Sequence, residues 1–266
     1  MLTLSHYPFS VSSQKVRMLL AEKNIIWQDN IIDLMKGEQL SDNFIKMNPK
    51  AEVPVLQHEG KFFYDSWLIN EYIEDSFPSP YFMTNDTLSD YTIRQWNMWA
   101  NENIHIASGI ISYLVLGRPQ LKAMDPESLN ALLSKIPQKE TREWRRNILE
   151  KGFEAHGILE SLRCFQNLFQ KMECSLKDSN AWLVGNRITL ADITIFPYVM
   201  RAEHAGLDFM MSYTQYPKLR AWYLRMLSRP SVQTSLLKYV DGNMQDTIMA
   251  MVVDAHPELI RLSEKL

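Results

Sequence analysis

The sequence predicts two domains: an α/β domain over residues 1–80 and an all-α domain over most of the remaining chain. Three observations lead to this expectation. The chain has 266 residues, which at roughly 100–200 residues per domain allows one large domain or two small ones. Short β-branched runs alternate with short amphipathic stretches before residue 80, whereas the periodic segments after residue 86 have helical spacing. The composition, 46% hydrophobic and 22% charged, excludes a disordered chain.

The first domain is expected to begin with a strand, a loop and a helix. Leu2–Leu4 form a short apolar run that predicts a strand. Ser12 and Ser13 are N-cap candidates for a helix that ends near Asn24. The β-branched residues of segment 26–33 then predict a second strand.

The rest of the first domain predicts a short helix, a hairpin and a final helix. Phe44–Met47 supply the short helix, and Val53–Leu56 with Phe62–Tyr64 predict two strands joined by a Glu-Gly turn. Ser66 opens the final helix, whose apolar side is expected to carry Leu68, Ile69, Tyr72 and Ile73. The order βαβαββα is that of a thioredoxin-like domain.

The boundary between the domains is predicted near residue 80. Two prolines mark segment 77–86, of which residues 81–86 are assigned to the linker. An all-helical domain is expected over residues 87–240, followed by a helical tail over residues 241–266. Within this half, helices are expected at Tyr91–Val115, Ile148–Met172, Ala191–Arg201 and Leu219–Ser228, with shorter helices and loops over 117–141.

Composition excludes several classes of function. The formal net charge of -3 argues against a basic surface that tracks nucleic-acid phosphates. Two cysteines cannot build a disulfide scaffold, and six scattered histidines lack the paired spacing of a metal site. The longest stretch without charge, Asn103–Gly117, is shorter than the ~20 apolar residues of a membrane-spanning helix. The N-terminus lacks the basic start and apolar run of a signal peptide, so we expect a cytoplasmic protein with a small-molecule or protein partner.

Three short segments are candidates for chemistry. The first is the loop His6–Arg17, which contains three serines and leads into the first helix. A helix N-terminus offers unpaired N–H groups and about half a positive charge, which suits an anion such as a thiolate or phosphate. The alternative is that these serines only cap the helix.

The second and third segments flank the predicted hairpin. In Asn48–Leu56, Pro54 stands at the start of a strand pattern, which favours a strand edge or a turn, including a cis bond. Backbone left unpaired at such an edge can bind an extended peptide. Asp65 and Ser66 follow the hairpin and start the next helix, where plain capping is again the alternative.

Taken together and in order, these segments resemble the glutathione transferase family. The resemblance covers residues 1 to about 240 and rests on S-V-S-S-Q-K-V-R, L-L-A-E-K, K-G-E-Q-L, N-P-K-A-E-V-P-V-L, Y-D-S and T-L-A-D-I. It implies a thioredoxin-like domain that holds glutathione as co-substrate, an all-helical domain, and an electrophile between the two. It also implies a cytoplasmic homodimer that requires no metal.

The resemblance assigns roles to several residues of the first domain. Pro54 matches the cis-proline of the family, and the backbone of Val53 would pair with the cysteinyl part of glutathione. Asp65 and Ser66 match the acidic residue and the serine that hold the γ-glutamyl group, which agrees with pairing of a carboxylate with an α-ammonium group. In the helical half, Thr189 and Asp192 resemble the capping box of the family, which we assign to folding.

The sequence departs from the family pattern at the residues that would bind the glycyl end of glutathione. Gln39 and Glu52 stand where related classes place a His and a Gln or Lys. Lys50 is the candidate cation that would replace them.

The residue that activates the thiol is expected to be a serine. Ser10 stands where plant-type and maleylacetoacetate-isomerase-type members place theirs and is the first candidate. Ser12, where a dehalogenase-like subgroup has a cysteine, is the second, and Tyr7 matches the tyrosine-type members only loosely. The loop contains no cysteine, and Cys164 and Cys174 are expected to be partly buried in the helical half. Glutathione would therefore supply the only sulfur nucleophile.

The electrophile pocket is expected along the first long helix of the second domain. Its candidates share helical spacing or lie one or two turns further on, and they are Trp96, Trp99, Asn103, Ser108 and Tyr113. The alternative for the tryptophans is core or dimer interface. His105 could polarise a leaving group or could be structural. An aromatic pocket of this kind suits a hydrophobic or aromatic electrophile.

Two further segments bear on the subgroup and on the pocket. Residues 136–153 resemble an insertion of bacterial transferases of the β-etherase-like branch, with an amphipathic solvated helix as the alternative. The tail has Met244, Ile248, Met251 and Val252 at helical spacing and is expected to pack over the pocket. The function expected is conjugation, ether cleavage or dehalogenation by glutathione. A non-catalytic member of the same fold, acting as a binding or interaction protein, is the alternative.

Overall fold

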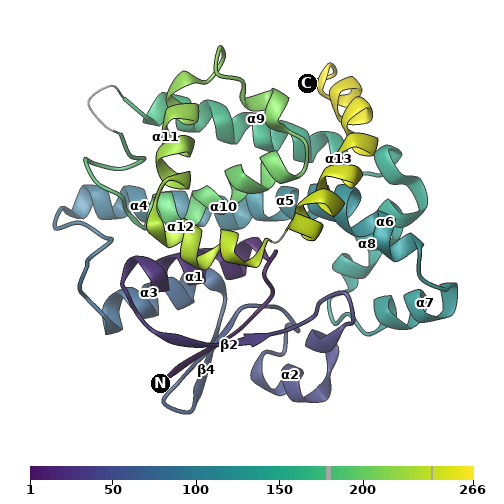
Figure 1. Ribbon diagram of the computed structural model, residues 1–266, viewed down its shortest axis with the longest axis horizontal. Helices are drawn as coiled ribbons and strands as arrows, with labels where there is room; N and C mark the ends of the chain where they lie inside the picture. The colour runs from purple at the N-terminus through teal and green to yellow at the C-terminus, as the bar shows by residue number, and fades with distance from the viewer. Residues whose placement is uncertain (178–180, 241) are drawn as a thin grey trace.

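The computed structural model describes residues 1–177, 181–240 and 242–266. A small sheet lies at one end of the molecule and a thick layer of helices at the other (Figure 1). The predicted combination of an α/β half and an all-helical half is confirmed. None of the helices in the described ranges is long and apolar enough to cross a membrane.

The N-terminal half contains one mixed sheet of order β2-β1-β3-β4, in which β1 is parallel to β2 and antiparallel to β3. Glu59 and Gly60 form the hairpin turn between β3 and β4, both with positive φ. The elements are β1 (Leu2–His6), α1 (Val11–Glu22), β2 (Trp27–Ile31), α2 (Asp42–Met47), β3 (Val55–His58), β4 (Lys61–Tyr64) and α3 (Ser66–Ser76).

Alternation along β3 places helices on both faces of the sheet. Val55 packs with Phe44 of α2 in a small separate cluster, whereas Leu56 points to the opposite face and joins the main core. α1 and α3 cover that second face and pack against each other. Because α1 also packs on α10 and α12, the main core is continuous between the two halves.

The C-terminal half is entirely helical in the described residues. Its helices are α4 (Thr87–Trp99), α5 (His105–Ser112), α6 (Arg118–Lys122), α7 (Pro126–Ser134), α8 (Lys139–Lys151), α9 (Ile158–Ser175), α10 (Leu190–His204), α11 (Pro217–Leu227), α12 (Pro230–Ser235) and α13 (Gly242–Ser263). Helical turns of π type, Ala100–Ile104 and Tyr113–Gly117, join α4, α5 and α6 into one long helix. Such turns often occur at functional sites.

The buried carboxylate of Asp192 organises the start of α10. It accepts hydrogen bonds from the Thr189 N–H at 2.9 Å, the Leu183 N–H at 3.0 Å and the Trp222 indole N–H at 2.8 Å. The predicted capping box is therefore present, and it also ties α11 to α10.

Three expectations about single elements were wrong. Ser10, and not Ser12 or Ser13, is the N-cap of α1. The helix expected over residues 148–172 is broken between α8 and α9, because Gly152 and Gly157 have positive φ, which favours glycine and ends a helix. Leu68 is exposed, because the buried stripe of α3 runs through Ile69 and Ile73 and Leu68 lies to one side of it.

Candidate active site

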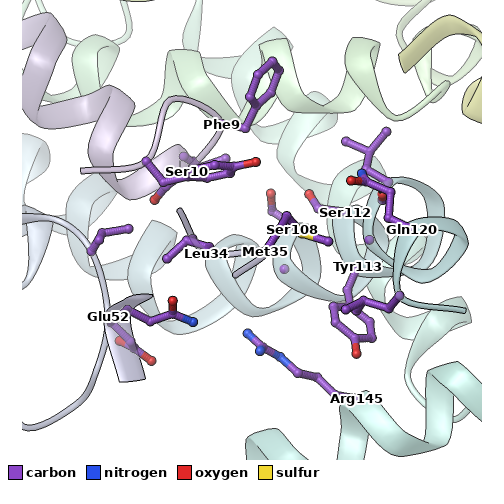
Figure 2. Close-up of a pocket in the computed structure, with 18 of the residues that line it drawn as sticks. Phe9, Ser10, Leu34, Met35, Glu52, Ser108, Ser112, Tyr113, Gln120 and Arg145 are labelled. Carbon is purple, nitrogen blue, oxygen red and sulfur yellow. The ribbon is translucent and has the colours of Figure 1, made fainter. Parts of the chain in front are cut away.

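A cavity of about 600 Å³ lies between the two halves. Its N-terminal wall is the loop before α1, the segment around Met35 and Gln39, and the Glu52–Val53 pair. Its C-terminal wall comes from α5, α6, α7, α8, α10 and α13 and from the π-type turn between α5 and α6. Figure 2 shows Ser10 and Glu52 on one side, Ser108, Ser112 and Tyr113 on the other, and Arg145 reaching into the space between them.

A second, smaller and mostly polar pocket adjoins this cavity. It is lined by Ser12, Asn48, Lys50, Glu52, Val53, Pro54, Asp65, Ser66, Asn101 and His105. Ser12, Glu52, Val53 and His105 line both spaces, so the two join at these residues. The structure thus brings together the serines of the loop, the Val53-Pro54 pair and the start of α3, which are far apart in sequence.

Ser10 and Ser12 occupy different positions at the N-terminus of α1. The Ser10 hydroxyl accepts a hydrogen bond from the Ser13 N–H at 3.2 Å, which leaves its own O–H free to donate. Ser12 lies in the first turn, half-buried, at the junction of the two spaces. The first turn contains no acidic residue, so the positive end of the helix dipole is not neutralised there.

Two buried arginines fix the backbone of the loop that carries Ser10. Arg17 donates to the carbonyl of Tyr7 at 3.3 Å and to that of Pro8 at 2.8 Å, and Arg201 of α10 donates to the carbonyl of Phe9. Three consecutive carbonyls therefore have guanidinium partners. Burial holds the pKa of Arg201 at about 10, which leaves it charged at neutral pH.

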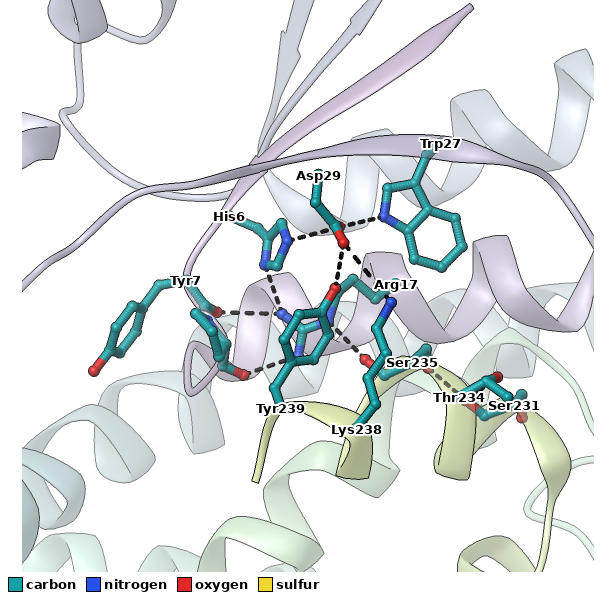
Figure 3. A network of polar contacts seen from close by, with 11 residues as sticks. His6, Tyr7, Arg17, Trp27, Asp29, Ser231, Thr234, Ser235, Lys238 and Tyr239 are labelled. Carbon is teal, nitrogen blue, oxygen red and sulfur yellow. Dashed lines mark hydrogen bonds and ion pairs between the residues drawn. The ribbon is translucent and has the colours of Figure 1, made fainter. Parts of the chain in front are cut away.

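Arg17 is in turn held from the opposite side (Figure 3). It donates to the Ser235 carbonyl and to His6 Nδ1, both at 2.8 Å, and His6 Nε2 lies 2.9 Å from Asp29. Burial, reinforced by the charge of Arg17, lowers the pKa of His6 to about 4. The imidazole is therefore neutral, and it accepts from Arg17 while it donates to Asp29.

The two predicted γ-glutamyl residues stand at the wall of the small pocket, but Asp65 already has a partner. Its carboxylate pairs with Lys50 Nζ at 2.8 Å, and this hydrogen bond raises the pKa of Lys50. Lys50 was the candidate cation for the glycyl end of glutathione. In this structure its charge is compensated, and it lines only the small pocket.

The peptide bond between Val53 and Pro54 is cis. Val53 precedes the register of β3, so it lies outside the β1–β3 ladder. The preceding loop is fixed by Asn48, whose side chain donates to the Glu52 carbonyl at 2.8 Å and accepts from the Lys50 N–H at 3.0 Å. These contacts present the Val53 backbone at the boundary of the two spaces.

The predicted electrophile residues divide into two groups. Ser108 and Tyr113 line the cavity, whereas Trp96, Trp99 and Asn103 do not. Trp96 is buried in the core at 3% exposure, Trp99 packs against the core, and Asn103 is exposed. Trp96 instead faces α9, whose Lys171 lies over its ring at 4.6 Å, and α4 packs on α10. Residues further along this long helix line the cavity, among them His105, Gly109, Ser112, Leu116 and Gln120.

His105 connects the cavity to the interior. Its Nδ1 lies 3.3 Å from the Tyr198 hydroxyl, which accepts a hydrogen bond from Lys15 Nζ at 2.6 Å. The surrounding protein, together with the charge of Lys15, lowers the pKa of His105 to about 4, so its ring is neutral. Because His105 lines both the large cavity and the small pocket, it lies beside any group held where the two spaces join.

Segment 136–153 and the tail contribute the outer walls. The segment supplies Ile136, Thr141, Trp144 and Arg145, and α13 supplies Met244, Thr247, Ile248 and Met251. Cys164 is half-buried and Cys174 exposed, the latter contrary to expectation, and neither lines the cavity. No group of three or more His, Cys, Asp or Glu that could hold a metal occurs among the residues described.

Comparisons with known proteins identify the family. The glutathione S-transferase N-terminal domain profile matches residues 4–81, and the glutathione S-transferase C-terminal domain profile matches residues 124–230. The chain belongs to the glutathione S-transferase family. Its relatives and structural neighbours are transferases, isomerases and etherases of this kind, and the protein is an enzyme of the same type.

The similarity to one relative, LigF, indicates the branch of the family to which this glutathione S-transferase is related. Protein LigF of Sphingobium sp. strain SYK-6 is 28% identical over 241 residues, 87% of this chain and 92% of that protein. The crystal structure titled beta-etherase LigF, from the same organism, superposes with a TM-score of 0.82 at 26% identity over 89% of this chain and 99% of that one. A probable maleylacetoacetate isomerase of Vibrio cholerae is 25% identical over 86% of this chain and 93% of that protein. The likeness supports the β-etherase-like branch of the family.

Proposed function

We propose that this transferase binds glutathione along the Val53-Pro54 edge, ionises its thiol at the N-terminus of α1, and directs the thiolate at an apolar or aromatic electrophile in the large cavity. The observation that carries the proposal is the junction of the two spaces at Ser12 and Val53. A thiol placed there faces the cavity, while the γ-glutamyl end of the peptide extends into the polar pocket.

The γ-glutamyl group is assigned to Asp65 and Ser66. The Asp65 carboxylate can pair with an α-ammonium, and the Ser66 hydroxyl with the start of α3 can receive an α-carboxylate. The cis Val53-Pro54 bond sets backbone groups outside the ladder, where they can pair with the cysteinyl unit as an added strand.

We assign thiolate stabilisation to Ser12, the second candidate from the sequence, because it lines both spaces, and give Ser10, the first candidate, the role of cap. An ordinary thiol with a pKa near ~8.5 must drop by about two units to be mostly ionised at neutral pH, which requires about 2.7 kcal/mol. A hydrogen bond to a charged group supplies about 1.5–3 kcal/mol and a helix N-terminus about 0.3–1 kcal/mol. One hydroxyl with the helix end therefore suffices without a buried general base.

The reaction forms a carbon–sulfur bond at the electrophile while the leaving group departs with its electron pair. The thiol proton passes to solvent when glutathione binds. The apolar residues of α8 and α13 in the lining favour an aromatic electrophile, and the similarity to the beta-etherase LigF makes aryl ethers the first substrates to try. His105 is placed to donate a hydrogen bond to the departing oxygen or halide.

Calorimetry with glutathione and the ultraviolet absorbance of the bound thiolate test this proposal. We expect Ser12→Ala to raise the pKa of bound glutathione by about one to two units. Ser10→Ala should instead cost about 1 kcal/mol of stability through the lost cap. Failure of wild type to bind glutathione would refute the proposal, and identical thiolate spectra for wild type and Ser12→Ala would refute the assigned donor.

We also propose that the protein is a cytoplasmic homodimer. Leu88, Tyr91 and Met98 form an exposed apolar stripe on α4, and the neighbouring α3 exposes Leu68. An ion pair of 3.6 Å between Glu71 and Arg94 ties the two helices together beside this stripe. Light scattering should give twice the 31.1 kDa chain mass, and a monomer at micromolar concentration would contradict the proposal.

A further inference from the structure

Arg145 of α8 is a cation in the wall of the cavity, and the charge of Glu52, which lines the same cavity, acts on it from beyond ion-pair distance. Its guanidinium lies over the rings of Tyr113 and Trp144, at 5.3 and 5.4 Å. Its Nε is buried and has no hydrogen-bond partner, and no carboxylate of the described residues lies within ion-pair distance. The stacked rings orient the group and leave its hydrogen-bond donors for a ligand.

The helix that carries Arg145 and its neighbours are fixed against the N-terminal half of the molecule. Gln138, the N-cap of α8, donates to the Lys50 carbonyl at 2.8 Å, and Gly37 contacts Leu132 of α7 so closely that a Cβ at Gly37 would lie 2.6 Å from the leucine methyl. From the other side, Arg118 of α6 donates to the Ile148 carbonyl at 3.0 Å. Arg145 therefore projects from a helix fixed at both ends.

The distribution of residues between the two spaces gives the direction of a bound tripeptide. Asp65 and Ser66 line only the small pocket, Val53 lines both spaces, and Gln39 and Arg145 line only the large one. A tripeptide paired with Val53 and ending at Asp65 therefore sends its other end towards Gln39 and Arg145. Gln39 is 8% exposed, and its amide oxygen has no partner.

We infer that Arg145, a residue of the helical half, binds the glycyl carboxylate of glutathione. This inference rests on the proposed function. Lys50 is committed to Asp65, and Glu52, the only carboxylate lining the large cavity among the described residues, repels an anion. A guanidinium that binds a carboxylate with two parallel hydrogen bonds supplies what this end lacks. Binding of glutathione would then bridge the two halves of the molecule.

Calorimetry with two ligands tests the inference. Glutathione and its glycyl monoethyl ester differ only in the carboxylate at that end. Wild type should bind glutathione about tenfold to hundredfold more tightly than the ester, as expected for a charge-assisted pair. Arg145→Met should bring this ratio to about one, and Arg145→Lys should retain part of it. Arg146→Met, an exposed neighbour on the same helix, is the control and should keep the wild-type ratio.

Each other outcome has a defined meaning. If wild type binds neither ligand, the proposed function fails; if it binds both equally, or Arg145→Met keeps the preference, only the role of Arg145 fails. The alternative ligand of Arg145 is a carboxylate on the electrophile. Turnover of 4-(bromomethyl)benzoate against the neutral 4-(bromomethyl)benzamide measures it. Loss of that preference in Arg145→Met, with the glutathione-to-ester ratio unchanged, would overturn the glycyl assignment.

Discussion

Lys15 provides a sharp test of the electrostatics beneath the site. Its side chain is 3% exposed, and its Nζ donates to the Tyr198 hydroxyl at 2.6 Å, with no carboxylate in ion-pair distance in the described part of the chain. Burial lowers the pKa of Lys15 from 10.5 to about 7. We therefore expect Lys15→Met to stabilise the protein near neutral pH.

The magnitude follows from the difference between the two pKa values. That difference corresponds to about 5 kcal/mol of destabilisation when the group is charged in both states. The unfolded chain binds more protons than the folded one between about pH 7 and 10.5, so the penalty shrinks by about 1.4 kcal/mol per pH unit across that window. Loss of the bond to Tyr198 offsets about 1 kcal/mol. Lys15→Met should thus be more stable by about 3 kcal/mol at pH 7.5 and equal to wild type near pH 9.8.

Urea unfolding of both proteins at several pH values measures the effect. Lys23 is the matched control, because it is also buried, at the C-cap of the same helix, but pairs with Glu74 at 2.8 Å. Lys23→Met leaves that carboxylate buried without a counterion, so it should destabilise by about 3–5 kcal/mol. A wild-type to Lys15→Met difference that does not change with pH would refute the reasoning.

Three further predictions concern the framework. Asp192→Ala leaves several buried N–H groups unpaired and should lower the free energy of unfolding by at least about 3 kcal/mol in urea. Arg17→Met frees two loop carbonyls before Ser10, and it should lower turnover at saturating glutathione about tenfold to hundredfold by misplacing the serines. Gly37→Ala has both a positive φ and a clash with Leu132, and should cost about 1–2 kcal/mol by thermal unfolding; Leu132→Ala in the same chain should recover only the part due to the clash.

The parts of the site that lie in short motifs could be predicted from sequence. The Val53-Pro54 pair and Asp65-Ser66 are each local patterns: a proline that permits the cis bond found here, and two residues that stand at the start of a helix. The capping box at Asp192 is similar, because a cap needs only its first turn. Such short patterns can be recognised in the sequence without knowledge of which residues pack against them in the fold.

The electrophile wall could not be predicted in the same way. Helical spacing groups Trp96 with Trp99, but it does not say which neighbour that face meets, and here it meets the core. The π-type turn at residues 100–104 also shifts the phase between this face and the one that reaches the cavity. Ser108 was among the predicted residues and lines the space, but its neighbours Gly109 and Ser112, which also line it, carried no apolar signal.

Arg145 illustrates a different limit. In sequence it belongs to a charged amphipathic helix, and Lys50, beside the glutathione motif, is the more natural cation. The ability of a cation to receive a ligand depends on whether another group already neutralises it, and partners cannot be counted along a chain. In the structure Lys50 pairs with Asp65, whereas Arg145 lies against two aromatic rings with no carboxylate of the described residues within ion-pair distance. The competence of each cation is thus a property of the fold, because Lys50 lines only the small pocket and already pairs with Asp65, whereas Arg145 lines the large cavity where the glycyl end is assigned.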